Sequence, residues 1–300
     1  MAVAASLINL FRRRGKFKAV LFIPDIEPGL ALKVLARFAD QIAIVNNETY
    51  AYLPKSLHKR ITVCGYPTRL ENMLIEKSAA RKELGITDEL PVILVAGGST
   101  GARSINYALL HILPALLDRY QIIHLSGRRD WDLVQNVSRR LQGDATISLP
   151  EEFQYLQPHP HADRYHAYAY LHEEMAAALA SADLVVSRAG ASCLGEYPLF
   201  QLPAILVPYP HAWRYQIINA NYLVGHGAAI LLEDSLLRTQ LLQQINALFE
   251  QTDTLATMKT NMGKLKTPSA GANIAQLIRK LAGDGSPANR MQTGSEEPAG

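Results

Sequence analysis

The sequence predicts a doubly wound α/β protein built from two units with parallel sheets. Short β-branched apolar runs alternate with helix-length segments through most of the 300 residues. Most of these runs are continuously apolar, which is typical of strands covered on both faces of a parallel sheet. The repeated strand–helix order favours the doubly wound arrangement. The expected strands are residues 18–24, 41–46, 60–65, 91–97, 121–127, 183–190, 203–210 and 228–234.

A break near residues 83–91, ELGITDELP, divides the chain. Five expected strands follow the break, enough for a complete Rossmann-like domain, and only three precede it. We therefore expect an incomplete first domain at residues 1–86, a second domain at 87–282 and a disordered tail at 283–300, which is polar and rich in Gly, Pro and Ser. Residues 151–170 match no helical period and are interpreted as a loop or hairpin insertion.

The bulk composition excludes several classes of protein. The net charge of +3 is too small to argue for nucleic-acid binding. The two cysteines, Cys64 and Cys193, lack the spacing of a zinc or disulfide framework, which fits a reducing cytoplasm. No apolar run is long enough to span a membrane.

Two glycine-rich turns each follow an expected strand. In the first, GGSTGARS, Gly97, Gly98 and Gly101 precede a helix that we expect to start at about Ala102. A strand, glycine loop and helix start together suit a phosphate group, although a tight turn that needs glycine explains the same pattern. The G-G-x-x-G spacing differs from that of a dinucleotide fingerprint, and no P-loop signature follows.

The second turn, SRAGASCLGE, adds a carboxylate. Gly190, Ala191 and Ser192 are able to offer N–H groups to a phosphate, and Glu196 is able to accept hydrogen bonds from two vicinal hydroxyls, as on a ribose. An acid is also favoured in the first turn of any helix, by about 0.3–1 kcal/mol. Two such turns in one domain favour a nucleotide cleft.

Some side chains also suggest other chemistry. G-A-S-C-L-G resembles a nucleophile elbow but has Leu194 where that motif needs glycine, so Cys193 is interpreted as a small turn residue. His159, His161 and His166 lie in a loop-like segment, and His172 follows it; we interpret all four as solvated residues and expect no metal site. The apolar and basic segment at residues 7–18 suits either an anionic membrane surface or a core helix with a solvated end.

Several motifs together resemble the MurG family of peptidoglycan glycosyltransferases. They are GGSTGARSIN, SRAGASCLGE, LPAILVPYPHAWRYQIINA and GAA, with PDIEPGLALKVLARFADQI and VCGYPTR upstream. The resemblance covers about residues 19–282. It implies a GT-B fold, two Rossmann-like domains that face each other across a cleft, and inverting transfer of N-acetylglucosamine (GlcNAc) from UDP-GlcNAc to a lipid-linked muramyl-pentapeptide. UDP-GlcNAc is then a co-substrate, and neither a cofactor nor a metal ion is expected.

The resemblance also implies roles for individual residues. The backbone at His172 faces the uracil, Glu196 holds the ribose, and Tyr215 and Gln216 reach the sugar. Arg69 and Ser99 lie near the diphosphate, and Asp25 lies near the acceptor and is the candidate general base. The diphosphate loop comprises Ala191, Ser192, Cys193, Leu194 and Gly195.

The chain departs from that family in its first domain. The family's glycine-rich loop on the first strand, GTGGH-like, is absent from this sequence. The expectation is therefore a chain truncated at its N-terminus, or one completed by a partner chain, that binds UDP-GlcNAc and turns over poorly alone at the cytoplasmic face of the cell membrane. The alternatives are a GT-B enzyme with another lipid or small-molecule acceptor, a non-catalytic fragment that binds UDP-sugar, and a hydrolase that uses Cys193.

Overall fold

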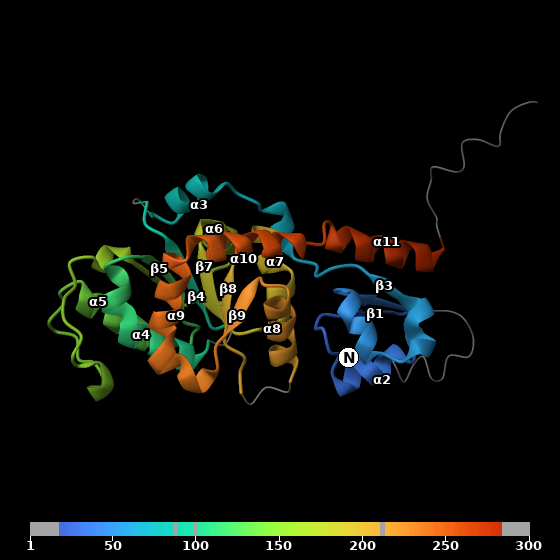
Figure 1. The fold of residues 1–300 in the computed structure, drawn as a ribbon, viewed down its shortest axis with the longest axis horizontal. Coiled ribbons are helices and arrows are strands. Elements are labelled where there is room, and N and C mark those ends of the chain that lie inside the picture. The colour runs from blue at the N-terminus through green and yellow to red at the C-terminus, as the bar shows by residue number, and fades with distance from the viewer. Residues whose placement is uncertain (1–17, 87–88, 99–100, 211–213, 284–300) are drawn as a thin grey trace, which may run out of the picture.

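The computed structural model describes residues 18–86, 89–98, 101–210 and 214–283, which form two α/β units (Figure 1). The expected N-terminal apolar segment and most of the expected tail lie outside these residues. The strands are β1 (Val20–Ile23), β2 (Gln41–Ile44), β3 (Ile61–Val63), β4 (Val92–Ala96), β5 (Gln121–Leu125), β6 (Tyr165–Tyr168), β7 (Leu184–Ser187), β8 (Ala204–Leu206) and β9 (Ala229–Leu231). The helices are α2 (Leu30–Ala36), α3 (Lys77–Glu83), α4 (Arg103–Leu117), α5 (Trp131–Leu141), α6 (Met175–Ser181), α7 (Glu196–Phe200), α8 (Tyr215–Gly225), α9 (Leu237–Glu250), α10 (Thr252–Lys264) and α11 (Ala270–Ala282).

The larger unit contains a six-stranded parallel sheet in the order β6-β5-β4-β7-β8-β9. Successive residues of the central strands point to opposite faces. Leu94 and Val185 pack with α6, α7 and α8 on one face, and Ile93, Val95 and Val186 pack with α4, α5 and α9 on the other. Both faces are therefore buried, which explains why these strands are continuously apolar in the sequence.

Strand β6 corrects the interpretation of residues 151–170 as a loop or hairpin insertion. Tyr165–Tyr168 pairs in parallel with β5 at the edge of the sheet. Tyr165 is buried, and the three residues after it are half-buried. An edge strand of this kind needs no continuous apolar run, so Tyr-His-Ala-Tyr carries a weak signal.

The smaller unit contains a three-stranded parallel sheet in the order β1-β2-β3. Ala36 of α2 packs with Ile42 and Ile44 on one face. On the other face, Leu277 of α11 packs with Ala43 and Cys64, so the last helix returns to the first unit (Figure 1). The prediction of two Rossmann-like units with parallel sheets is confirmed.

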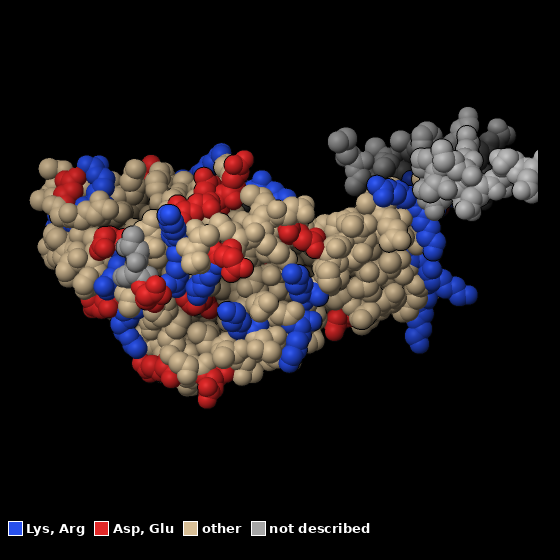
Figure 2. Space-filling view, turned by 90° about the horizontal axis from the view of Figure 1, so that it is seen from above, with Lys and Arg blue, Asp and Glu red and all other residues tan. Residues whose placement is uncertain are grey.

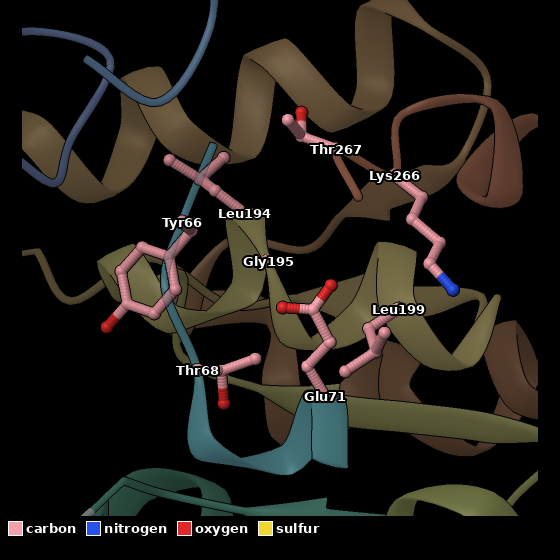
Figure 3. Close-up of a pocket in the computed structure, with 8 residues that line it drawn as sticks. All are labelled: Tyr66, Thr68, Glu71, Leu194, Gly195, Leu199, Lys266 and Thr267. Carbon is pink, nitrogen blue, oxygen red and sulfur yellow. The ribbon is translucent and has the colours of Figure 1, made fainter. Parts of the chain in front are cut away.

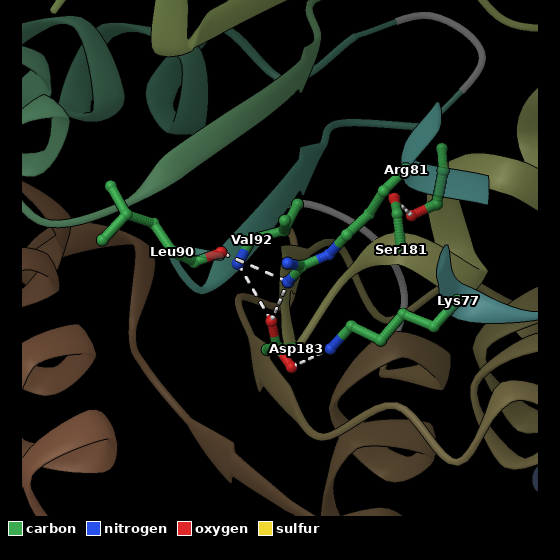
Figure 4. Close-up of polar contacts among 7 residues, drawn as sticks. Lys77, Arg81, Leu90, Val92, Ser181 and Asp183 are labelled. Carbon is green, nitrogen blue, oxygen red and sulfur yellow. Dashed lines mark hydrogen bonds and ion pairs between the residues drawn. The ribbon is translucent and has the colours of Figure 1, made fainter. Parts of the chain in front are cut away.

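Helix α3 lies before the predicted domain boundary at residues 86/87 yet is attached to the second unit, and that boundary stays a prediction. Asp183, directly before β7, accepts hydrogen bonds from Val92 N (3.0 Å) and from the Arg81 guanidinium (3.2 Å) and pairs with Lys77 (Figure 4). Ala80 and Leu84 are buried in the core of the second unit. One carboxylate thus joins α3 to the amino ends of β4 and β7.

We predict that Asp183→Asn lowers the free energy of unfolding in urea by about 1–2 kcal/mol, because two cations and one backbone N–H lose a charged acceptor that is partly exposed. The exposed Glu83→Gln on the same helix is the matched control, with an expected change below about 0.5 kcal/mol. Equal effects of the two variants would contradict this role for Asp183.

Candidate functional site

The candidate site is a cleft of about 940 Å³ at the carboxyl ends of the strands of the larger sheet. Strands β4 and β7 are neighbours in the sheet, but the chain leaves β4 toward β5 on one side and leaves β7 toward β8 on the other. Doubly wound sheets bind ligands in the crevice at such a switch point. Both predicted glycine turns line the cleft, through Gly97, Gly98 and Gly101 of the first and Gly190 and Ser192 of the second.

The first turn requires glycine for two different reasons. Gly98 and Gly101 have φ angles of +82° and +78°, which side chains rarely adopt. A Cβ on Gly101 would also lie 2.4 Å from the Ser126 carbonyl oxygen, and one on Gly97 would lie 2.2 Å from the Ala102 nitrogen. Helix α4 then begins at Arg103, as predicted. Ser99 lies outside the described residues.

A buried hydrogen-bond chain supports this turn from below. Asn106 Nδ2 donates to the Ser126 carbonyl and to Asp130, each at 2.8 Å, so its Oδ1 is the acceptor for His124 Nε2 at 3.0 Å. His124 Nδ1 then accepts from the Tyr165 hydroxyl at 2.7 Å. Burial lowers the pKa of His124 to about 3, so the ring stays neutral in this arrangement.

The second turn brings Glu196 to the cleft. Ala191–Leu194 form one 3-10 turn, and Glu196 is the first residue of α7. Burial raises the pKa of the Glu196 carboxyl, while a hydrogen bond from the Ser192 side chain and the positive charge of Arg69 lower it. Glu196 and Ser192 both line the cleft. The carboxyl is therefore held ready to accept hydrogen bonds in a poorly hydrated place.

Four of the five predicted loop residues do not line the cleft: Ala191, Cys193, Leu194 and Gly195. Cys193 and Leu194 are 1% and 5% exposed and belong to the core, and Leu194 and Gly195 border a separate cavity of about 10 Å³ with Tyr66 and Thr68 (Figure 3). Burial raises the pKa of the Cys193 thiol far above its ordinary value. A buried, protonated thiol is a poor nucleophile, which argues against the hydrolase alternative.

Arg188 organises the floor of the cleft and was not singled out from the sequence. Its guanidinium donates to Asp234 (2.5 Å), to Ser104 (2.7 Å) and to the Val207 carbonyl (3.1 Å). It also lies 5.2 Å from the centre of the Tyr209 ring. One side chain thus ties together the loops after β7, β8 and β9 and the start of α4.

Asp25 reaches the second unit through Asn219, which was also missed. Asn219 Nδ2 donates to Asp25 at 2.8 Å and to the Ala189 carbonyl at 3.2 Å, and its Oδ1 accepts from Ile26 N. Burial raises the pKa of Asp25, and the bond to Asn219 lowers it. Asn219 lies three positions after Gln216 on α8, a helical spacing that could have indicated it.

The remaining predicted residues lie near the seam, which is the region where the two units meet. Arg69 donates to the His172 carbonyl at 2.6 Å, so the structure brings these two together. Gln216 lines the cleft, and its Oε1 accepts from Tyr209 N at 2.9 Å. Tyr215 instead faces the first unit, where a Cβ on Gly29 would lie 2.8 Å from its hydroxyl.

No group of His, Cys, Asp and Glu side chains within the described ranges could hold a metal ion. His159 pairs with Asp118 at 3.4 Å and His166 with Gln121 at 2.9 Å, so these two rings are engaged separately. Within the same ranges, no helix is long and apolar enough to cross a membrane.

Two parallel-sheet units facing each other, with a cleft at the switch point of the second, define a GT-B fold. The crystal structure of MurG from Acinetobacter baumannii is similar with a TM-score of 0.65 and 23% identity, over 92% of this chain and 72% of that one. The lipopolysaccharide glycosyltransferase WaaG is similar with a TM-score of 0.53 and 14% identity, over 93% of this chain and 82% of that one.

The sequence comparisons identify the family. Residues 92–274 match the glycosyltransferase family 28 C-terminal domain, and the chain belongs to this family. Curated relatives named UDP-N-acetylglucosamine–N-acetylmuramyl-(pentapeptide) pyrophosphoryl-undecaprenol N-acetylglucosamine transferase include one from Roseiflexus sp. (strain RS-1), 36% identical over 91% of this chain and 66% of the relative. Another, from Desulforudis audaxviator, is 34% identical over 89% of this chain and 68% of the relative. The chain spans about two thirds of the length of these relatives, and the resemblance found in the sequence is confirmed.

We predict that Gly101→Ala lowers the melting temperature, because it combines an unfavourable φ with a collision against the Ser126 carbonyl. The expected loss in the free energy of unfolding is about 1–3 kcal/mol. Gly190→Ala is the matched control, since Gly190 has an ordinary φ of −68° and nothing lies within 4 Å of its Cβ position. Melting measured by circular dichroism should separate the two, and an unchanged Gly101→Ala protein would contradict this account of the turn.

Proposed function

We propose that this chain binds UDP-GlcNAc in the cleft and is an inverting GlcNAc transferase for a lipid-linked muramyl-pentapeptide. The family membership and the names of the relatives support the substrate pair. The observation that carries the proposal is the position of Glu196 beside the second glycine turn, at the switch point of the sheet. In the reaction, an acceptor hydroxyl attacks the anomeric carbon, the bond to the diphosphate breaks, and UDP leaves.

Donor binding follows from the two turns. The ionised Glu196 accepts hydrogen bonds from the vicinal ribose hydroxyls, and the turns at Gly98 and Gly190 allow the diphosphate to approach the backbone closely. Gln216 has its amide N–H groups available to the sugar, since its oxygen is occupied by Tyr209 N. We propose that the backbone at His172 faces the uracil.

In the proposed reaction, fixed positive charges stabilise the leaving group, UDP. A departing diphosphate is stabilised by preorganised donors and cations. Arg69 lies near enough to Glu196 to lower the pKa of its carboxyl, and Arg103 lines the cleft at the start of α4. The proposal assigns this task to these side chains and to the helix start, without a metal ion or cofactor.

Asp25 is the proposed general base on the acceptor side. Burial raises the pKa of its carboxyl toward the range in which a carboxylate takes up a proton more readily, and Asn219 fixes its orientation. Asn219 also bonds the Ala189 carbonyl in the second glycine turn. The base and the donor loop are thus held by one amide.

We predict that calorimetric titration of the chain with UDP-GlcNAc shows binding and that Glu196→Gln weakens it at least about tenfold, or about 1.4 kcal/mol. The amide keeps the size of the side chain and loses the charge that accepts from two hydroxyls. Glu250→Gln, exposed on α9, is the control, and NAD should not bind. Equal binding by both variants would remove the assignment of Glu196.

We further propose that the first unit docks on an anionic membrane surface and is completed by further polypeptide, such as a partner chain. Figure 2 shows Lys and Arg side chains along the end of this unit that is remote from the second. Exposed basic residues of the unit include Lys18, Arg37, Lys55 and Lys59. Its exposed large apolar residues include Leu30 and Val34 of helix α2 and Phe38 directly after the C-cap of that helix. Strand β1 forms one edge of its sheet within the described residues. We propose the cytoplasmic face of the membrane as the location of this activity.

We predict that the chain alone transfers GlcNAc to the lipid-linked acceptor slowly, although it binds the donor, because its first unit has only three strands among the described residues. Transfer is measured with radiolabelled UDP-GlcNAc and lipid acceptor in detergent, beside a relative such as the Desulforudis audaxviator enzyme. Turnover equal to that of the relative would overturn this expectation. Transfer to other lipid or small-molecule acceptors instead would support the alternative acceptor class.

A further inference from the structure

Tyr66 lies at the seam between the two units and has contacts on both sides. It follows β3 in the segment that leads to the second unit. On one side its ring packs edge-to-face with Phe22 of β1, with 6.3 Å between ring centres. On the other side it lies directly over Gly195, the residue before Glu196. Figure 3 shows Tyr66 beside the segment that carries Leu194 and Gly195.

Gly195 is glycine because of Tyr66 and not because of its backbone. Its φ of −123° is open to any residue, so no left-handed conformation requires glycine here. A Cβ at this position would lie 2.6 Å from the Tyr66 Cβ and 2.8 Å from its Cδ1. Atoms do not approach so closely, and the nearest one belongs to the stiff base of the side chain. The ring and the turn therefore fit each other without spare room.

We propose that Tyr66 is a positioning residue: its ring, held by Phe22 and seated on Gly195, fixes Glu196 and shields its carboxyl from water. This inference rests on the proposed function, in which Glu196 holds the donor's ribose. It adds a residue of the interdomain segment to the determinants of donor binding. The first unit thereby takes part in donor binding through packing alone.

The side chains around Glu196 agree with this role for Tyr66. Arg69 and Tyr66 come from the interdomain segment, while Ser192, Cys193 and Tyr197 come from the turn and from α7. Burial, with the negative charges of Glu196 and Asp25, raises the pKa of Tyr66, so the phenol stays neutral. Among the described residues its hydroxyl has no hydrogen-bond partner, so the ring and not the hydroxyl is expected to matter.

The first test compares Tyr66→Phe with Tyr66→Ala in UDP-GlcNAc titrations between pH 4.5 and 8. The ionised Glu196 binds the ribose, so affinity falls as the pH falls through the pKa of this carboxyl, which burial raises. Tyr66→Ala admits water and lowers the pKa of Glu196. The acid limb of the pH profile, which is the range in which affinity falls, then moves to lower pH. Tyr66→Phe keeps the ring and should keep the wild-type limb. A merely structural loss would weaken binding at every pH without moving the limb, and would overturn the proposal.

The second test uses the tight contact itself. Gly195→Ala should weaken UDP-GlcNAc binding at least about threefold in the wild-type background, because the methyl group displaces either the ring or the turn. Alanine at position 66 would keep the colliding Cβ, so the second background is Tyr66→Gly, which removes all three close atoms, and there Gly195→Ala should cause no further loss. Equal losses in both backgrounds would show that Tyr66 and Gly195 act independently and would overturn the proposal.

The outcomes separate the inference from the proposed function. Wild-type protein that binds no UDP-GlcNAc removes the function and, with it, the positioning role. Wild-type binding without coupling between positions 66 and 195 removes the positioning role alone. Urea denaturation of every protein in the two tests shows whether each variant is folded, so that an unfolded variant is not mistaken for one that fails to bind.

Discussion

The adjacency of β4 and β7 is the constraint on which the rest of the structure depends. Four parallel pairings, Ile93–Leu184 to Ala96–Ser187, bring the ends of these strands together. Because consecutive connections diverge from this pair, the two glycine turns face one cleft without helices between them. At the opposite ends of the same two strands, Asp183 bonds Val92 N and holds α3. One strand pair thus places the site at one end and an anchor for the interdomain segment at the other.

The two chain crossings between the units are fixed by close backbone contact. Gly65 has a φ of +85°, and a Cβ there would lie 2.7 Å from the Thr267 Cβ on the returning crossing. Glu71 of the first crossing accepts a hydrogen bond from Ser269 N of the second, where Ser269 has a φ of 55°. Asn273 Nδ2 donates to the Cys64 carbonyl at 3.1 Å. The crossings form one connection, so the seam at Tyr66, Asp25 and Asn219 has a defined geometry.

Most of the fold could be predicted from the sequence because most strands are buried on both faces. All eight expected strands occur, since Val92–Ala96 and its neighbours need apolar residues at every position. Strand β6 was missed because an edge strand tolerates His166 and Tyr168 in half-buried places. In the site, the glycine turns could be predicted from local composition. Arg188 and Asn219 could not, because they act through partners distant in the sequence, such as Asp234 and Asp25. Such pairs follow from topology, which local patterns do not contain.

The two buried carboxylates of the seam explain why ligand binding would stabilise the site. Burial raises the pKa of both Glu196 and Asp25, so their folded-state values exceed the unfolded ones. The folded protein therefore binds protons more tightly there, and these two groups reduce stability as the pH rises through that range. At neutral pH the two buried carboxylates cost free energy in the empty protein. In the proposed function, ribose hydroxyls that donate to Glu196 would offset that cost, so donor binding would stabilise the site. The same burial requires walls, and Tyr66, Cys193 and Leu194 supply them, which is why part of the predicted phosphate loop turns into the core and away from the cleft.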